Sequence, residues 1–255
     1  MQMRKKDTST AKWIIITLLM SSLCYFPMML ENLGVIVPNV IISVKYFFVI
    51  LPFLITIFFK LREKELKQWL IGLFTFNNKK TAIIMCGSFI IIGLTASCIY
   101  ALATNKPDLF KKTYPGLSSV IGGGIYLYIT ALFEEMAWRG FLLDRIVAVK
   151  KWKSLVCIGV TWGIWHIPMW AIRNLLGAKE IIYFFVWTFL VSLILGTIYL
   201  RCRNILVTAF LHFIFNFCFL SPVSYNIAVL TLIIVVMYAI NKRKSGQIPF
   251  GREQD

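Results

Sequence analysis

The sequence predicts an all-α, polytopic membrane protein with about eight transmembrane helices. Hydrophobic residues make up 59% of the 255 positions, above the roughly 45–50% that is usual in soluble domains. Long apolar runs recur along the whole chain, and basic residues gather in the short segments between them. The excess of 27 Lys and Arg over 11 Asp and Glu therefore indicates contact with anionic lipid headgroups and not with nucleic acid.

The apolar runs predict a single transmembrane domain over residues 1–255. The eight spans run from Trp13 to Leu30, Val40 to Phe59, Thr81 to Ala103, Leu117 to Leu143, Leu155 to Ile172, Ile181 to Leu200, Ile205 to Phe219 and Ser224 to Ile240. The first run is similar to a secretory signal, but no small-residue cleavage pattern follows it, so we expect it to remain as a span. Residues 60–80 mix basic residues with Glu63, Glu65 and Trp69, which favours a short amphipathic segment at the membrane interface.

Small residues and one proline indicate how the spans pack. The three glycines at positions 122–124 favour close approach of a neighbouring helix, and Gly159 and Gly163 have the GxxxG spacing that is common in packed helices. Pro168 removes a backbone donor two residues after His166, which predicts a kink there.

The charges between the spans predict that both ends of the chain are cytoplasmic. With the N-terminus inside, the eight spans assign 20 Lys and Arg to cytoplasmic segments and six to outer segments, the bias that is typical of inner loops. Residues 241–255 are then a polar, basic cytoplasmic tail. The Lys- and Ile-rich composition favours a bacterial plasma membrane as the location.

Three charged residues lie inside the fourth span. Glu134, Glu135 and Arg139 would each cost roughly 2.5–3.5 kcal/mol at the centre of a helix in the bilayer, so their presence indicates a function. Glu135 and Arg139 are four residues apart and can pair, whereas Glu134 is rotated by about 100° on the helix and faces elsewhere. The alternative is a structural ion pair beside a Glu134 carboxyl that burial keeps protonated.

Both histidines of the chain, His166 and His212, also lie inside apolar runs. A single histidine in such a run is usually a satisfied core residue, but here no histidine lies elsewhere. Measured along the helices at ~1.5 Å per residue, Glu134, His166, His212 and Asn216 have similar depths. His212 and Asn216 are four residues apart and share a helix face. We therefore expect one polar site on the fourth, fifth and seventh spans.

These residue types suit the hydrolysis of a peptide bond. An unpaired carboxylate at Glu134, beside an imidazole, can take a proton from water, and the imidazole or the acid formed can later protonate the leaving amine. His212 and Asn216 can donate hydrogen bonds to the oxyanion of a tetrahedral intermediate, which is worth about 3–4 kcal/mol per donor. The sequence contains neither a G-x-S-x-G motif nor the HExxH spacing of zinc peptidases.

A zinc ion is the alternative source of the same chemistry. Its ligands would be Glu134, His166 and His212. We expect no metal and no other cofactor, for two reasons. Catalytic zinc usually has its histidines oriented by a further carboxylate or carbonyl, and Glu135 is better placed to neutralise Arg139. Asn216, one turn from His212, suits an oxyanion better than a cation.

At these positions the sequence resembles the CAAX protease and bacteriocin-processing family of intramembrane glutamic endopeptidases, also called the Abi family. Its EExxxR motif is met in full by Glu134, Glu135 and Arg139. Its FxxxH motif is met at His166 with Trp162 in place of Phe, and its HxxxN motif by His212 and Asn216. The three motifs make residues 131–219 the motif-bearing catalytic core, and the eight-span layout agrees with the family's fold.

The resemblance implies an endopeptidase in which Glu134 and His166 activate water while His212 and Asn216 form the oxyanion hole. The supporting residues are then Glu135, Arg139 and Trp162. Eukaryotic relatives trim prenylated C-terminal tails, and bacterial relatives are associated with bacteriocin or peptide-pheromone maturation, self-immunity and lysostaphin resistance. The bacterial composition favours the second group, with a peptide or protein substrate at the membrane.

Two functions of other classes fit the same residues. One is a non-enzymatic membrane protein, an immunity factor that binds a bacteriocin or a scaffold for a partner enzyme, in which the polar cluster serves packing. The other is a small transporter whose Glu and His residues relay protons. Short broken spans related by internal symmetry would favour a transporter, and the sequence shows no such pair. Cleavage of a peptide distinguishes the enzyme from both.

Overall fold

The computed structural model describes residues 2–77, 79–103, 117–147 and 151–218, and every regular element in these ranges is a helix. The elements are α1 (Gln2–Leu23), α2 (Phe26–Asn32), α3 (Asn39–Ile42), η1 (Ser43–Phe47), α4 (Leu51–Arg62), α5 (Leu66–Gly72), α6 (Lys79–Ala103), α8 (Leu117–Ala137), η2 (Trp138–Leu143), α9 (Asp144–Ile146), α10 (Lys151–Pro168), η3 (Met169–Arg173), α11 (Ala178–Cys202) and α12 (Ile205–Cys218). The all-α prediction is confirmed for the part of the chain that the structure describes.

Several of these helices have the length and apolar character of membrane spans. The three that qualify by themselves are Thr8–Asn32, Lys151–Arg173 and Ala178–Cys202. A fourth arises if the bent pair Asn39–Phe47 and Leu51–Arg62, whose axes differ by 60°, is one span. α6 and α8 are helical over the third and fourth predicted spans. These helices support a multi-pass membrane protein, while the predicted span at 224–240 and the tail at 241–255 lie outside the described residues.

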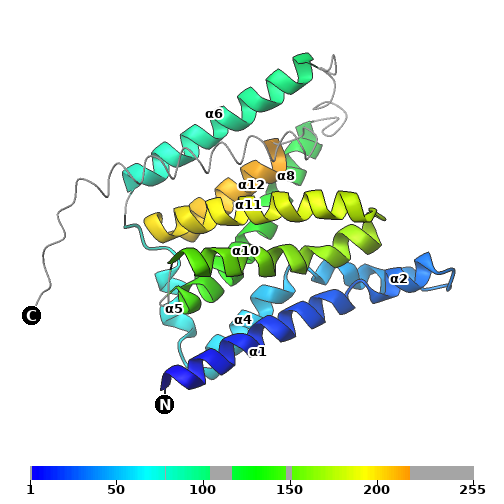
Figure 1. Cartoon of the computed structure of the whole chain (residues 1–255), viewed down its shortest axis with the longest axis horizontal. Coiled ribbons are helices and arrows are strands. Elements are labelled where there is room, and N and C mark those ends of the chain that lie inside the picture. Colours follow the sequence, from blue (N-terminus) through cyan, green and yellow to red (C-terminus); the bar gives the residue numbers. More distant parts are fainter. Residues whose placement is uncertain (1, 78, 104–116, 148–150, 219–255) are drawn as a thin grey trace, which may run out of the picture.

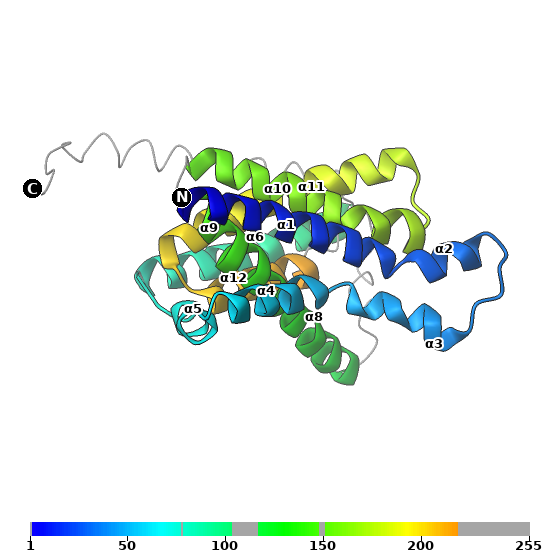
Figure 2. The same ribbon diagram turned by 90° about the horizontal axis from the view of Figure 1, so that it is seen from below.

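The helices form two layers (Figures 1 and 2). α1, α10 and α11 lie side by side in one layer, and α4, α8 and α12 form the other. α6 packs against both α11 and α12 at one edge. The core between the layers includes the buried indoles of Trp13, Trp138 and Trp165. The ring centroids of Trp13 and Trp138 are 5.3 Å apart, and those of Trp138 and Trp165 are 5.6 Å apart.

The glycine predictions have different outcomes. A Cβ atom added at Gly159 would lie 2.7 Å from the Phe189 ring, and one at Gly163 would lie 2.7 Å from the Phe185 ring. The GxxxG spacing is thus confirmed as the close contact between α10 and α11. The prediction of close packing is wrong at Gly122, because no described atom lies within 4 Å of a Cβ added there. Figure 2 shows the reason, since the first turns of α8 project beyond the two layers.

Two helices change to π-helical hydrogen bonding close to the predicted site. η2 continues α8 from Trp138, and η3 continues α10 from Met169. Pro168 is the last residue of α10, so the predicted kink takes the form of a change from α to π geometry. Because π turns are rare and are frequent at functional sites, their positions, one residue before Arg139 and three after His166, favour a functional site here.

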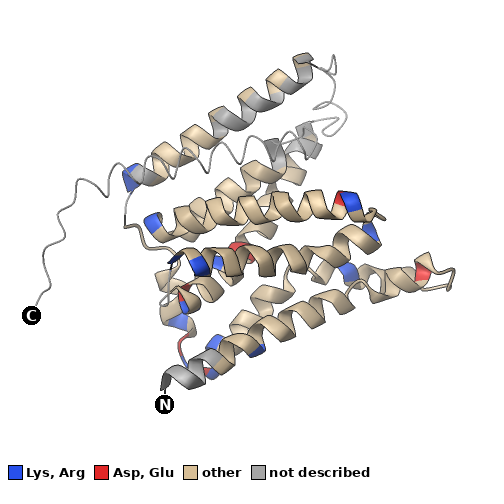
Figure 3. Ribbon diagram, viewed as in Figure 1, with Lys and Arg blue, Asp and Glu red and all other residues tan. Residues whose placement is uncertain are grey.

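Figure 3 shows that Lys and Arg are distributed unevenly between the two ends of the helical layers. Most of them lie at the end that holds α5 and the first turns of α1, and fewer lie at the opposite end near α2. In three dimensions, the described basic residues therefore keep the asymmetry on which the predicted orientation rests.

Candidate active site

Glu135 and Arg139 form a fully buried ion pair. Both side chains are 0% exposed, and Arg139 Nη1 lies 2.7 Å from Glu135 Oε1. The pairing expected from their spacing of four residues is thus present. Arg139 Nη2 also donates a hydrogen bond to Ser192 Oγ of α11 at 3.0 Å. The guanidinium therefore ties α11 to the end of α8.

Glu134 points to a different partner, as its rotation around the helix predicts. Trp162 Nε1, on α10, donates a hydrogen bond to Glu134 Oε2 at 3.0 Å. The Glu134 side chain is almost completely buried, at 7% exposure. One carboxylate is thus neutralised by a cation, while the other accepts a hydrogen bond from a neutral indole that supplies no positive charge.

His212 of α12 is oriented by Glu135. Its Nδ1 lies 2.9 Å from Glu135 Oε1, the same oxygen that Arg139 contacts. Glu135 therefore has two partners, whereas the sequence indicated only Arg139. Its second oxygen, Oε2, has no hydrogen-bond partner among the described residues. With Nδ1 occupied, Nε2 is the nitrogen of His212 that remains for other contacts.

His166 is held by its own helix and by three indoles. Its Nδ1 lies 2.8 Å from the carbonyl oxygen of Trp162, one turn earlier on α10. The ring of Trp170 stacks on the imidazole at 5.3 Å, and the rings of Trp162 and Trp165 meet it edge-on at 4.9 and 4.7 Å. Because a carbonyl only accepts, Nδ1 is the donor and Nε2 keeps a free lone pair.

Trp162 contacts three of the candidate catalytic residues, Glu134, His166 and His212. Its indole nitrogen binds Glu134, its carbonyl binds His166, and its ring lies 5.2 Å from the ring of His212. The Arg139 guanidinium lies over the same indole, 4.6 Å from its centroid. The departure from the FxxxH motif therefore supplies a hydrogen-bond donor that phenylalanine lacks.

Asn216 is placed differently from the other candidates. It follows His212 by one turn on α12, as its spacing requires, but its side chain is exposed. No contact among the described residues joins it to Glu134, His166 or His212. His212 and Asn216 therefore lie on one helix, as predicted, but no contact among the described residues joins them in a common pocket.

The arrangement bears on the zinc alternative in two ways. Glu135 and the Trp162 carbonyl orient His212 and His166 through Nδ1, as second partners do for histidines that bind zinc. Glu135 does neutralise Arg139, as expected, but it also orients His212, which comes within reach when α12 packs on α8. However, among the described residues no three His, Cys, Asp or Glu side chains are close enough to hold a metal ion.

One residue that contacts the buried ion pair was missed from the sequence. Ser192 accepts the hydrogen bond from Arg139 and is 1% exposed. Its span also contains Thr188 and Thr197, so the only available signal, a small polar residue in an apolar run, does not single out Ser192.

A cavity of about 200 Å³ lies apart from this cluster, between α5 and the end of η2. Its lining residues include Lys60, Glu65, Trp69, Gly140 and Arg145. None of the candidate catalytic side chains lines it.

Comparison with known proteins agrees with the motifs. Residues 116–218 match the family described as type II CAAX prenyl endopeptidase Rce1-like. The chain is also 33% identical over 49 residues to CAAX prenyl protease 2 of Methanococcus maripaludis, a match that covers 19% of this chain and 18% of that protein. Both matches support a protease.

The matched range contains every candidate site residue, from Glu134 to Asn216. The resemblance found in the three motifs is therefore confirmed, since residues 116–218 match the Rce1-like family of CAAX endopeptidases.

Proposed function

We propose that the protein is an intramembrane endopeptidase that hydrolyses a peptide bond near the membrane with a water molecule activated by Glu134 and His166. The observation that carries the proposal is the convergence of Glu134, His166 and His212, from three helices, on Trp162. A packing role alone does not require two histidines to be oriented through Nδ1 with Nε2 left for other contacts.

The contacts favour one distribution of protons. His166 is neutral, with its proton on Nδ1, so that Nε2 can accept a hydrogen bond from the water. His212 donates from Nδ1 to Glu135, so it can donate from Nε2 to an oxyanion only as an imidazolium. Glu134 and Glu135 then balance the charges of Arg139 and His212. A total charge of zero suits side chains that are buried in the protein.

The proposed reaction follows from these protonation states. Water held between Glu134 and His166 loses a proton to the carboxylate as its oxygen attacks the carbonyl carbon of the scissile bond. The oxyanion forms near His212, with Asn216 as the second proposed donor. The proton then moves from the Glu134 carboxyl to the departing amine, which restores the carboxylate.

The test is cleavage by the purified protein in proteoliposomes. A library of short membrane-proximal peptides is offered in prenylated and unprenylated forms, and the products are identified by mass spectrometry. We expect cleavage of unprenylated peptides, since the composition favours a bacterial peptide substrate, such as a bacteriocin or pheromone precursor. Binding without cleavage of any bond would instead favour an immunity or scaffold protein, and proton movement without cleavage would favour a transporter.

We expect hydrolysis to be independent of metal. Protein stripped with a membrane-compatible chelator, and shown by elemental analysis to lack zinc, should cleave the identified peptide at the rate of untreated protein. The reason is that Glu134 acts as a base in this mechanism and not as a ligand. Loss of cleavage that stoichiometric zinc restores would make Glu134, His166 and His212 ligands instead.

We also propose that both termini are cytoplasmic in the plasma membrane. Reporter fusions should read as cytoplasmic after Lys80, Lys153 and Arg203. They should read as external near Lys111, Lys179 and Ser221. The expectation rests on the excess of 20 over six basic residues. A cytoplasmic signal at Ser221 would remove the argument that His212 has the same depth as Glu134.

A further inference from the structure

α5 and the residues that follow it make close contact with the turn that carries Arg139. Trp69 Nε1 donates a hydrogen bond to the carbonyl oxygen of Gly140 at 2.8 Å. A Cβ atom at Gly140 would lie 2.3 Å from Leu73 Cδ2, so the glycine allows the buried Leu73 to lie directly against the backbone of η2. Gly140 is the next residue after Arg139, and its carbonyl belongs to a π turn, where bonding departs from the regular α-helical ladder.

The same segment also holds the start of the helix that carries His212. The carbonyl oxygen of Leu73 accepts a hydrogen bond at 2.8 Å from the backbone nitrogen of Ile205, the first residue of α12. Thr75 Oγ1 lies 3.2 Å from the carbonyl oxygen of Arg203 and 2.9 Å from that of Gly72, so its one proton is shared between these two acceptors. The backbone nitrogen of Asn77 donates to the carbonyl of Cys202 at 3.1 Å. Arg203 has a φ of 53°, the left-handed conformation that turns the chain sharply from α11 into α12.

From these contacts we infer that residues 66–77 are a clamp that sets the position of the Glu135–Arg139 pair relative to His212, with Trp69 and Thr75 as positioning residues. The clamp binds η2 on one side and the start of α12 on the other, and Leu73 touches both. Its contacts are independent of whether the site is catalytic, but their effect on turnover rests on the proposed function.

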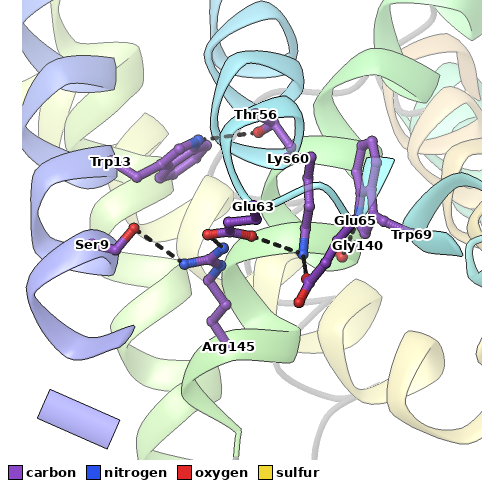
Figure 4. Close-up of polar contacts among 9 residues, drawn as sticks. All are labelled: Ser9, Trp13, Thr56, Lys60, Glu63, Glu65, Trp69, Gly140 and Arg145. Atoms are coloured by element: carbon purple, nitrogen blue, oxygen red, sulfur yellow. Dashed lines mark hydrogen bonds and ion pairs between the residues drawn. The ribbon is translucent and has the colours of Figure 1, made fainter. Parts of the chain in front are cut away.

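A partly exposed network of charges contacts the start of the clamp (Figure 4). Lys60 Nζ lies 3.2 Å from Glu63 and 2.8 Å from Glu65, the residue before α5. Arg145 pairs with Glu63 and also donates to Ser9 Oγ of α1 at 3.5 Å. The figure shows these ion pairs beside the bond from Trp69 to Gly140. These contacts connect the start of α5 to α1, α4 and α9.

The clamp matters for catalysis because the site depends on a contact between helices. Glu135 meets His212 across the interface of α8 and α12, at 2.9 Å. A relative shift of these helices by about 1 Å is enough to cost on the order of 100-fold in rate in an oriented active site. Since Trp69 and Thr75 lie outside the site, their loss should lower kcat and leave KM, which reflects substrate contacts, nearly unchanged.

Two substitutions test the clamp from its two sides. Trp69→Phe removes the hydrogen bond to Gly140 and keeps an aromatic ring. Thr75→Val keeps the size of the side chain and removes the hydroxyl that contacts the carbonyl oxygens of Arg203 and Gly72. We expect kcat to fall by about tenfold in each, with KM within about twofold of the parent value. Thr75→Ser, which keeps the hydroxyl, should restore kcat. Trp152→Phe is the matched control, because Trp152 is exposed on α10 and lies outside both the site and the clamp.

A distance measurement makes the test independent of turnover. Spin labels are attached at Ile129→Cys on α8 and Leu206→Cys on α12, two exposed positions, in a chain whose native cysteines are replaced. Electron paramagnetic resonance should give a broader distance distribution in Trp69→Phe and Thr75→Val than in the parent or in Trp152→Phe. An unchanged distribution in both clamp variants overturns the inference. If the parent protein cleaves no peptide, the proposed function fails and the distances alone decide the clamp.

Discussion

Glu134→Gln should abolish peptide cleavage while the protein accumulates and stays folded. Glutamine keeps the shape of the side chain, and its amide oxygen can still accept the hydrogen bond from Trp162 Nε1. The amide cannot take a proton from water, however, so the loss should be at least about 10³-fold, within the range that a general base contributes. The measurement is kcat/KM for the peptide identified in proteoliposomes, together with the thermal unfolding temperature of each variant.

Two further variants serve as a control for the chemical change and as a test of the other carboxylate. Glu31→Gln makes the same chemical change at an exposed glutamate of α2, so it should retain full activity. Glu135→Gln should impair folding as well as activity, because Glu135 binds both Arg139 and His212. Since Glu135 Oε2 has no partner among the described residues, Glu135 is the competing candidate for the base. A folded but inactive Glu135→Gln protein beside an active Glu134→Gln protein would exchange their roles.

Contacts within one helix could be predicted from the sequence. The spacing of Glu135 and Arg139 predicts their pairing, and a rotation of about 100° per residue predicts that Glu134 faces another partner. The apolar runs likewise predict helices at α1, α6, α8, α10, α11 and α12. These predictions succeed because they depend only on helix geometry and on hydrophobic character, both of which are local properties of the chain.

Contacts between helices could not be predicted in the same way. Trp162 binds Glu134 across 28 residues of sequence, Arg139 binds Ser192 across 53, and His212 binds Glu135 across 77. Each depends on how far one helix is rotated against the next, which the packing of many side chains decides. The π turn of η2 adds to the difficulty, because it changes the direction of every side chain that follows it.

Arg139→Ala should lower the free energy of unfolding far more than the loss of a surface ion pair does. The substitution leaves Glu135 charged in a site where it is 0% exposed, and breaking a buried pair in this way typically costs about 3–5 kcal/mol. The matched control is Arg203→Ala, whose partner is Asp144 and whose pair is about one-third exposed on each side. That loss should cost at most about 1 kcal/mol.

The double variant Arg139→Ala with Glu135→Gln separates charge from packing. Removing the negative charge that Arg139→Ala leaves unpaired should restore much of the lost stability and accumulation, although the contacts of the guanidinium with Ser192 and with the Trp162 ring stay lost. Activity should not return, because His212 then lacks the carboxylate that orients it. Unfolding in detergent micelles measures stability, and size-exclusion chromatography measures accumulation. If Arg139→Ala is no less stable than Arg203→Ala, the buried pair does not hold the site together.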